Sequence, residues 1–435
     1  MSSDALAGLL GVLLLLALLV AGVPIGVSLG LVGFGGLTLL LGLEPALIKS
    51  GVLLFDTLSR YELGVLPLFL LMAHLCFAAN ASRDFFRAAA GLVGHRRGGL
   101  ALASVGACAG FGAISGSSLA TAATIGLVAL PEMRERGYSD SFATGVVAAG
   151  GTLGQAVPPS GALIVFGIIS EQSIGKLFTA AIVPALTQML LYGITIVLLC
   201  HFRPAIAPAS PRVSRAERWR GLVRILDVAV LVLIVIGGIS VGWFTPSEAA
   251  SVGAVGGLML CAWRRRLTWP ALGHALAETL RTSGMIYAVI IGALIFSVFI
   301  SLTGLAEAVS SLIGSVSDNR VVAMLMIAVV LLVLGSLLDG LALMLLTTPI
   351  LLPIVQQLGL SPIWFGIFLI RAMEIGFVHP PIGMNLYVIH GIAKDVPISR
   401  IFRGVLPFLG ADFVHLLLLI LIPGLALELP KLLAP

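Results

Sequence analysis

Long unbroken runs of apolar residues, separated by short polar segments, extend along the whole chain. A helix needs about 20 mostly apolar residues to cross the hydrocarbon core of a bilayer. The runs do not alternate with polar residues, as the strands of an outer-membrane barrel would. The pattern therefore predicts an all-α polytopic membrane protein with ten full crossings, at residues 5–22, 26–43, 63–79, 141–170, 177–200, 226–244, 248–263, 284–304, 362–390 and 401–423.

Two other apolar stretches are interrupted by small and polar residues and are predicted to be re-entrant helical hairpins. Residues 99–130 form two short arms around Ser115–Ser118, and residues 321–357 form two arms around Gly335–Gly340. The amphipathic segments 46–62 and 268–283 are predicted to lie at the membrane interface. The polar residues 211–225, near the midpoint of the chain, are expected to form a cytoplasmic linker.

The positions of the basic residues support this layout. If both hairpins are re-entrant, the basic loops fall on one face, which the positive-inside rule assigns to the cytoplasm. These loops contain His95–Arg97, Arg134–Arg136, Arg203–Arg224, Arg264–Arg266 and Lys394–Arg403. Both chain ends are then expected on the outer face. The first run has no basic segment before it, which favours a first crossing over a cleaved signal peptide.

The composition excludes a soluble enzyme and a disordered chain. Of the 435 residues, 59% are hydrophobic and 10% are charged, whereas a soluble domain carries about 25% charged residues. The net charge of +5 does not indicate a nucleic-acid partner, because the basic residues lie in short loops between apolar runs. The four cysteines lie in or beside apolar runs without metal-ligand spacing, so neither disulfides nor a zinc site is expected.

A shift of 222 residues aligns the two halves of the chain. Pro24 falls on Pro246, and the pattern Gly-x-x-x-Pro-Pro-x-Gly recurs at residues 154–161 and 376–383. Each half has five predicted crossings, and an odd number inverts the second half relative to the first. We therefore expect inverted repeats at 1–210 and 226–435. Their re-entrant hairpins are 99–130 and 321–357, and their broken helices are 141–170 and 362–390.

The Pro-Pro pairs and the hairpin tips together suggest ion sites. A Pro-Pro pair ends a helix and leaves upstream carbonyls without donors, and such groups persist in a membrane only when buried in protein or lining a cavity. Carbonyls and hydroxyls suit a hard cation such as Na⁺. The predicted ligands are Ser115, Ser117 and Gly154–Val157 in the first half, and Asp339, Gly335–Gly340 and Gly376–His379 in the second. The new helix N-termini attract a carboxylate, with Thr121, Thr124, Ser160, Thr348 and Asn385 predicted to line the substrate pocket.

Plainer interpretations apply to the same residues. Closely spaced Gly and Ser often serve only helix packing, and a Pro-Pro pair often only kinks a helix. Asp339 at membrane depth is costly, so an ion or proton role is favoured over a structural hydrogen bond. Arg371 and Glu374 are expected to pair with each other, and Asp412 and His415 are expected to form an interfacial pair.

Five ordered motifs resemble the large membrane subunit of the tripartite ATP-independent periplasmic (TRAP) transporters. They are Gly112-Ala-Ile-Ser-Gly-Ser-Ser118, Gly151-Thr-Leu-Gly-Gln-Ala-Val-Pro-Pro-Ser160, Ser173-Ile-Gly-Lys-Leu-Phe178, Pro349-Ile-Leu-Leu-Pro353 and Gly376-Phe-Val-His-Pro-Pro-Ile-Gly-Met-Asn385. The family often has Thr where this chain has His379. A carbonyl ligand would survive that change and a hydroxyl ligand would not, and His titrates near neutral pH.

The resemblance implies an elevator-type, Na⁺-driven transporter in the bacterial inner membrane. The outer face on which the loop charges place both chain ends is then the periplasmic face. It implies two partners, a small four-helix membrane subunit and a periplasmic substrate-binding protein. Its substrates would be organic acids such as C4-dicarboxylates or sialic acid, with Na⁺ as coupling ion and no cofactor. By motif match, the Na⁺ sites transfer to Ser115, Ser117 and Gly154–Pro159, and to Asp339, Gly340 and Gly376–Pro381.

Other functions are compatible with parts of the same pattern. A stand-alone Na⁺- or H⁺-coupled dicarboxylate carrier shares the plan of hairpins and broken helices. A non-transporting scaffold would gain no stability from Na⁺. The sequence contains no catalytic triad, H-E-x-x-H or phosphate-loop pattern, so an enzyme or an ATPase is not expected.

Overall fold

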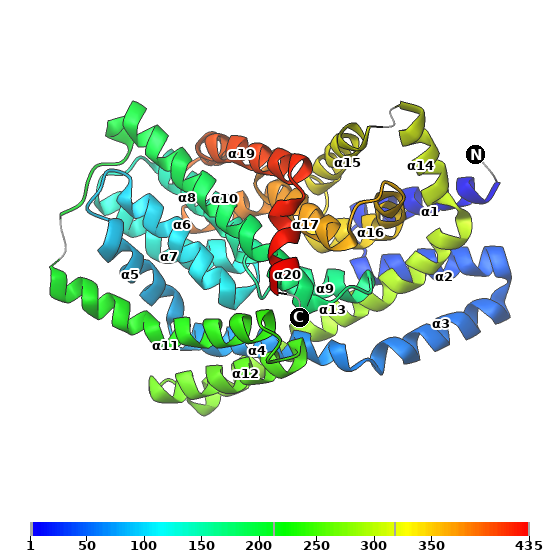
Figure 1. Ribbon diagram of the computed structural model, residues 1–435, viewed down its shortest axis with the longest axis horizontal. Helices are drawn as coiled ribbons and strands as arrows, with labels where there is room; N and C mark the ends of the chain where they lie inside the picture. The colour runs from blue at the N-terminus through cyan, green and yellow to red at the C-terminus, as the bar shows by residue number, and fades with distance from the viewer. Residues whose placement is uncertain (1–2, 212–213, 317–318, 434–435) are drawn as a thin grey trace.

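A computed structural model describes residues 3–211, 214–316 and 319–433, and within these ranges all regular secondary structure is helical (Figure 1). Seven described helices are long and apolar enough to cross a membrane, or eight if one bent pair counts as a single span. The predicted all-α polytopic fold is confirmed. Three predicted crossings correspond to helices that are not among these candidate spans, namely 26–43, 248–263 and 362–390.

The first half contains ten α-helices and one 3-10 turn among the described residues. They are α1 (Ser3–Val20), α2 (Ile25–Leu41), α3 (Leu43–Leu58), η1 (Tyr61–Gly64), α4 (Val65–Ala78), α5 (Ala81–Val93), α6 (Gly99–Ser115), α7 (Ser118–Glu135), α8 (Asp140–Ala156), α9 (Gly161–Ile169) and α10 (Ile174–Phe202).

The second half follows the short turn η2 (Pro204–Ile206). Its helices are α11 (Arg215–Ser240), α12 (Pro246–Trp263), α13 (Trp269–Thr303), α14 (Leu305–Val316), α15 (Arg320–Gly335), α16 (Gly340–Gln357), α17 (Pro362–Val378), α18 (Met384–Ile392), α19 (Ile398–Leu421) and α20 (Gly424–Leu433). Adding 222 to the residue numbers that bound α7 and α8 gives the bounds of α16 and α17.

Two segments differ from the sequence-based expectation. Residues 268–283 are not a separate interfacial helix, because they continue into the crossing as the single 35-residue helix α13. In the first half the equivalent stretch is divided into α3, η1 and α4. The linker expected at 211–225 is mostly helical, because a capping box between Ser214 and Glu217 starts α11 at Arg215. Positions 212–213 of that linker lie outside the described residues, as do the extreme chain ends.

In each hairpin the start and the end lie close together. The residues flanking the first hairpin bond to the same short turn, since Gly98 N donates to Ala207 O at 3.3 Å and Ser139 N donates to Ile206 O at 3.0 Å. The start and the end of the second hairpin also lie side by side. Arg320 begins α15 and Gly359 follows α16, and a Cβ on Gly359 would lie 3.2 Å from Arg320 Nη2. The predicted re-entrant hairpins are therefore α6–α7 and α15–α16.

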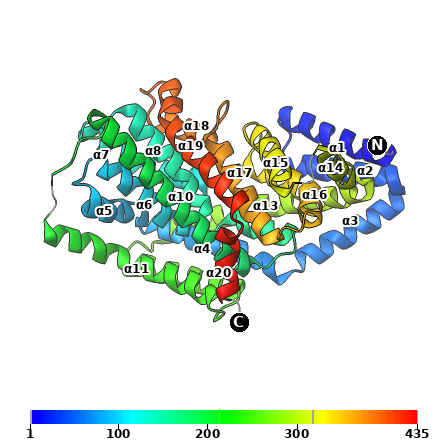
Figure 2. The same cartoon turned by 45° about the horizontal axis from the view of Figure 1, so that its top comes forward.

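The helices form two groups, which we call the framework (α1–α4 and α11–α13) and the inner body (α6–α10 and α15–α19). In the framework, α13 packs against α2 and α4, and α12 packs against α4. Several of these helices run along the lower edge of the molecule in Figure 1 and remain there in Figure 2. In the inner body, α8 packs against α6, α7 and α19, so helices of the two halves are intermixed.

Candidate functional site

The tip of the first hairpin packs directly against the break between α8 and α9. A Cβ on Gly112 would lie 2.7 Å from Gly154 Cα, and a Cβ on Gly116 would lie 2.9 Å from Pro159 O. Gly116 also has φ of +57°, a conformation that glycine adopts without steric cost. No larger residue fits at these two tip positions without displacing backbone.

Oxygen atoms gather where this tip meets the break. Ser115 Oγ lies 2.7 Å from Thr121 Oγ1, and a Cβ on Gly154 would lie 2.6 Å from Ser117 O. The helix α8 ends at Ala156 and α9 departs from it at a bend of 43°. Because Pro158 and Pro159 have no N–H, the carbonyls of residues 154 and 155 have no helical donor four residues ahead. The predicted first-half residues, including Val157 within the break, are thus brought together.

The second hairpin repeats this arrangement against the break between α17 and α18. A Cβ on Gly376 would lie 2.5 Å from Gly335 O, and a Cβ on Gly340 would lie 2.7 Å from Phe377 Cζ. Asp339 caps α16. Pro380 and Pro381 likewise leave the carbonyls of residues 376 and 377 without helical donors.

His379 ends α17 beside this second break. Its ring is half-buried and lies edge-on to Phe413, with the ring centroids 6.3 Å apart. Nδ1 of His379 is buried and has no hydrogen-bond partner among the described residues. The imidazole therefore packs against α19 and does not line the cavity described next.

A cavity of about 840 Å³ lies between the two hairpin tips and the framework. That volume is in the range of sites for small organic ligands. Its polar lining comes mainly from the two tips and the first break, namely Ser115, Ser117, Ser118, Gln155, Ser160 and Asp339. The framework contributes a mostly apolar wall from α1–α2, α4 and α13, in which Thr282 of α13 is polar. First-turn residues of α2, α7, α9 and α16 all line the cavity, so four helix N-termini with partial positive charge face it.

The predicted substrate residues divide into two groups. Ser160 lines this cavity, whereas Thr121, Thr124, Thr348 and Asn385 do not. Thr121 bonds to Ser115, Thr124 is half-buried on α7, and Thr348 is buried on α16.

Asn385 instead joins the two halves of the inner body. Its Nδ2 donates to Ser118 Oγ at 2.9 Å and to Ala148 O at 3.0 Å. The second broken helix is thereby bonded to the first hairpin and to α8. Gln155 belongs to the motif at residues 151–160, which predicts its carbonyl as an ion ligand but does not predict that the residue lines the cavity. The framework wall carries no motif.

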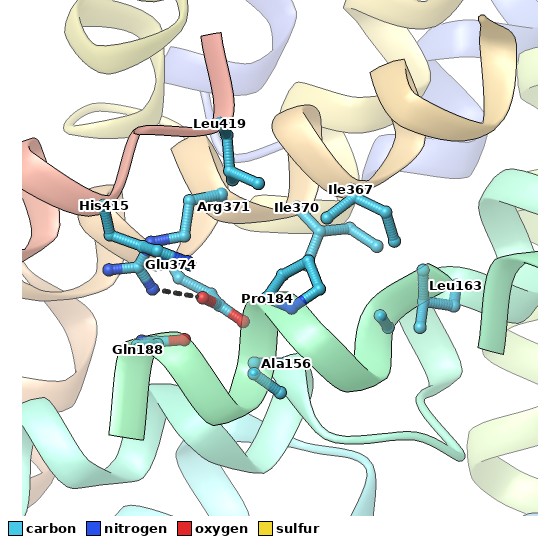
Figure 3. A pocket seen from close by; sticks show the side chains of 12 residues that line it. Ala156, Leu163, Pro184, Gln188, Ile367, Ile370, Arg371, Glu374, His415 and Leu419 are labelled. Atoms are coloured by element: carbon cyan, nitrogen blue, oxygen red, sulfur yellow. Dashed lines mark hydrogen bonds and ion pairs between the residues drawn. The ribbon is translucent and has the colours of Figure 1, made fainter. Parts of the chain in front are cut away.

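A cluster of buried charges lies inside the inner body, where α10, α17 and α19 meet (Figure 3). Arg371 Nη1 donates to Glu374 Oε2 at 2.6 Å, which confirms the expected pairing, and Arg371 also pairs with Asp412. The expected interfacial pair of Asp412 and His415 is wrong. Both are almost fully buried, and His415 Nε2 lies 2.9 Å from Thr187 Oγ1. The ion pair of Arg371 and Asp412 therefore links α17 to α19. The cluster lines no part of the large cavity.

The chain matches one family of membrane transporters along almost its whole length. The family model described as "Tripartite ATP-independent periplasmic transporter, DctM component" matches residues 12–425. The chain is 35% identical over 405 residues to the C4-dicarboxylate TRAP transporter large permease DctM of Pseudomonas aeruginosa, covering 93% of this chain and 94% of that one. It is 34% identical over 418 residues to the sialic acid TRAP transporter large permease SiaM of Vibrio cholerae, covering 96% and 97%.

A solved structure shows the same fold at lower identity. The YdaH transporter of Alcanivorax borkumensis aligns with a TM-score of 0.61 at 15% identity, covering 88% of this chain and 89% of that one. At this identity the likeness concerns the arrangement of the helices alone.

Proposed function

The chain belongs to the large-permease (DctM) family of tripartite ATP-independent periplasmic transporters, and we propose that it imports an organic acid across the bacterial inner membrane together with Na⁺. The observation that carries this proposal is the cavity lined by both hairpin tips. Four helix N-termini face it, and a helix N-terminus favours an anion through its free N–H groups and its dipole.

Na⁺ coupling is supported by the two places where a tip meets a broken helix. Each brings together carbonyls without helical donors and side-chain oxygens, which in the first half come from Ser115 and Thr121 and in the second from Asp339. Hard cations prefer such all-oxygen sites. Because both sites border the cavity, bound Na⁺ would hold the tips in the conformation that accepts the substrate.

The division into framework and inner body supports an elevator movement. Both tips and both breaks belong to the inner body, whereas α1, α2, α4 and α13 supply the opposite, mostly apolar wall. An inner body that slides along this wall would carry the substrate and the ions together. Inverted repeats supply two related end states for such a movement.

The remaining parts of the proposal concern partners. The family is tripartite by description, so we propose a small four-helix membrane subunit and a periplasmic substrate-binding protein as the other two components. The names of the relatives specify C4-dicarboxylates and sialic acid, which are carboxylic acids. Both chain ends are proposed to face the periplasm, in agreement with the basic loops on the opposite side.

The test is uptake of radiolabelled organic acids into proteoliposomes that contain the permease and its small subunit. We expect uptake that requires an inward Na⁺ gradient and added binding protein. Uptake without the binding protein would instead indicate a stand-alone carrier. Uptake driven by a pH gradient without Na⁺ would refute Na⁺ coupling, and an absence of uptake for every acid would refute transport of organic acids.

A further inference from the structure

The helices α5 and α11 pack side by side and run in opposite directions (Figure 1, Figure 2). A Cβ on Gly91 would lie 3.8 Å from Arg218 Cα, and a Cβ on Gly221 would lie 3.4 Å from Ala88 Cα. The residue numbers at the contact therefore rise along one helix as they fall along the other. Because glycine has no side chain at these two positions, the helices approach closely.

The acidic groups beside this contact are already bonded. Arg264 of α12 donates to Asp84 of α5 at 2.6 Å and to Asp227 of α11 at 2.7 Å. The carboxylate of Glu217 accepts from Ser214 N at 3.2 Å in the capping box of α11. Arg264 thus ties α5, α11 and α12 together and takes up two of the three carboxylates.

Two exposed arginines on each helix lie along the contact, namely Arg83, Arg87, Arg220 and Arg224. None of the four forms an ion pair with another described residue. Arg87 and Arg220 each come one residue before a contact residue. On antiparallel helices, positions displaced in the same sense from the contact lie on the same side of the pair. Arg83 and Arg224 are four residues from these two, so all four arginines share one side.

The four arginines also lie close to the ends of membrane crossings. Each is within eight residues of the crossing predicted at 63–79 or at 226–244. At 1.5 Å per helical residue, this places them at most about 12 Å from the hydrocarbon. The polar headgroup region begins at the edge of the hydrocarbon and is about 5–8 Å thick in each leaflet. Long arginine side chains at these positions reach the level of the phosphates.

An apolar stripe on α11 adjoins the arginines. Trp219, Val223, Leu226 and Val230 are all exposed, Trp219 by 69%, and they recur at the spacing of one helix face. Lipid tails cover such a stripe, and Trp is enriched at the level of the headgroups. A soluble acidic protein or a nucleic acid would cover the arginines but not the stripe beside them. The combination therefore fits a bilayer lipid.

We propose that Arg83, Arg87, Arg220 and Arg224, which we call the basic patch, bind the phosphate headgroups of anionic phospholipids in the cytoplasmic leaflet. Guanidinium groups bind phosphate oxygens in pairs, with defined geometry. Because α11 belongs to the framework and Arg264 joins α5 to it, the bound lipids hold the framework in that leaflet. The inference goes beyond the proposed transport and does not depend on it.

The test is thermal unfolding of the purified full-length chain in detergent, titrated with phosphatidylglycerol. In a patch variant, all four arginines of the basic patch are replaced by Gln. We expect phosphatidylglycerol to raise the unfolding midpoint of the unmodified chain. The patch variant should need at least about tenfold more lipid for the same rise, because each basic residue adds to the attraction for an anionic surface. Added NaCl should weaken the response of the unmodified chain.

A second fourfold variant is the matched control. Arg136, Lys394, Arg400 and Arg403 are exposed and belong to the same set of basic loops, but they lie away from α5 and α11. Their replacement by Gln changes the net charge by the same amount, and we expect this variant to respond like the unmodified chain. A full response of the patch variant would overturn the proposal. An equal loss in both variants would also overturn it, because net charge alone would then explain the binding.

Other additives identify the occupant. We expect phosphatidylcholine, which has no net charge, and inorganic phosphate to raise the midpoint much less than phosphatidylglycerol does. An equal response to phosphatidylcholine, an equal response to inorganic phosphate, or no response to phosphatidylglycerol would each overturn the proposal. If the patch variant does not fold, Arg83→Gln with Arg87→Gln and Arg220→Gln with Arg224→Gln are tested as separate pairs. Each pair should then lose part of the response, and a full response in both would overturn the proposal.

Discussion

The close approach of the first hairpin to the broken helix can be tested by adding one methyl group. In Gly112→Ala the new Cβ would lie 2.7 Å from Gly154 Cα and 2.8 Å from Leu153 O. Both neighbours are backbone atoms, so they cannot turn away as a flexible side chain would. Overpacking of this kind costs about 1–3 kcal/mol.

Gly106→Ala isolates that cost. Gly106 lies on the same helix, α6, and a Cβ there would meet nothing within 4 Å. Both substitutions gain about 1 kcal/mol in helix propensity, so their difference is the cost of the contact. We expect Gly106→Ala to be neutral or stabilising, and Gly112→Ala to be about 1–3 kcal/mol less stable than Gly106→Ala.

The assay measures both stability and ion dependence. Unfolding midpoints of the two purified variants are compared over a series of NaCl concentrations, and the Na⁺ concentration for half-maximal uptake is measured in proteoliposomes. Gly112→Ala should show the lower midpoint and require more Na⁺, because its tip is displaced from the carbonyls of the break. Equal midpoints and equal Na⁺ requirements for the two variants would refute the close contact.

Two further outcomes are expected. Arg371→Met should be among the most destabilising single changes, by about 3–5 kcal/mol, because it leaves two buried carboxylates without their cation; an unfolding midpoint close to that of the unmodified chain would refute this. The hydrogen bond from Arg134 lowers the pKa of Asp395, so their ion pair stabilises the fold at neutral pH and is lost as the pH falls below about 4. Asp395→Asn should therefore lower the unfolding midpoint at neutral pH, and the two midpoints should converge in acid.

The hairpins and their contacts with the broken helices were predictable because local chemistry specifies them. Pro-Pro pairs stop helices wherever they occur, and the same order of features recurs 222 residues later. The pairing of Arg371 with Glu374 was predictable for a similar reason, since residues three apart share a helix face.

Other features depend on packing between distant segments. The spacing of Asp412 and His415 places them on one face of α19 but does not reveal that Arg371, 41 residues before Asp412, faces them. The role of Asn385 depends on Ser118, 267 residues away. The amphipathic composition of residues 268–283 predicts a separate interfacial helix, but residues 281–286 contain no Pro and a single Gly, so α13 continues through them.

The bond between Ser118 and Asn385 also constrains how the protein is made. The two residues are separated by 267 positions, which ribosomes synthesise in roughly 13–53 s at rates of 5–20 residues per second. During that interval the first hairpin is already in the membrane, but the helix that bonds to it has not been made. The nascent first half must therefore persist as an incompletely packed insertion intermediate, and a membrane chaperone or the translocon itself would be most needed at this stage of biogenesis.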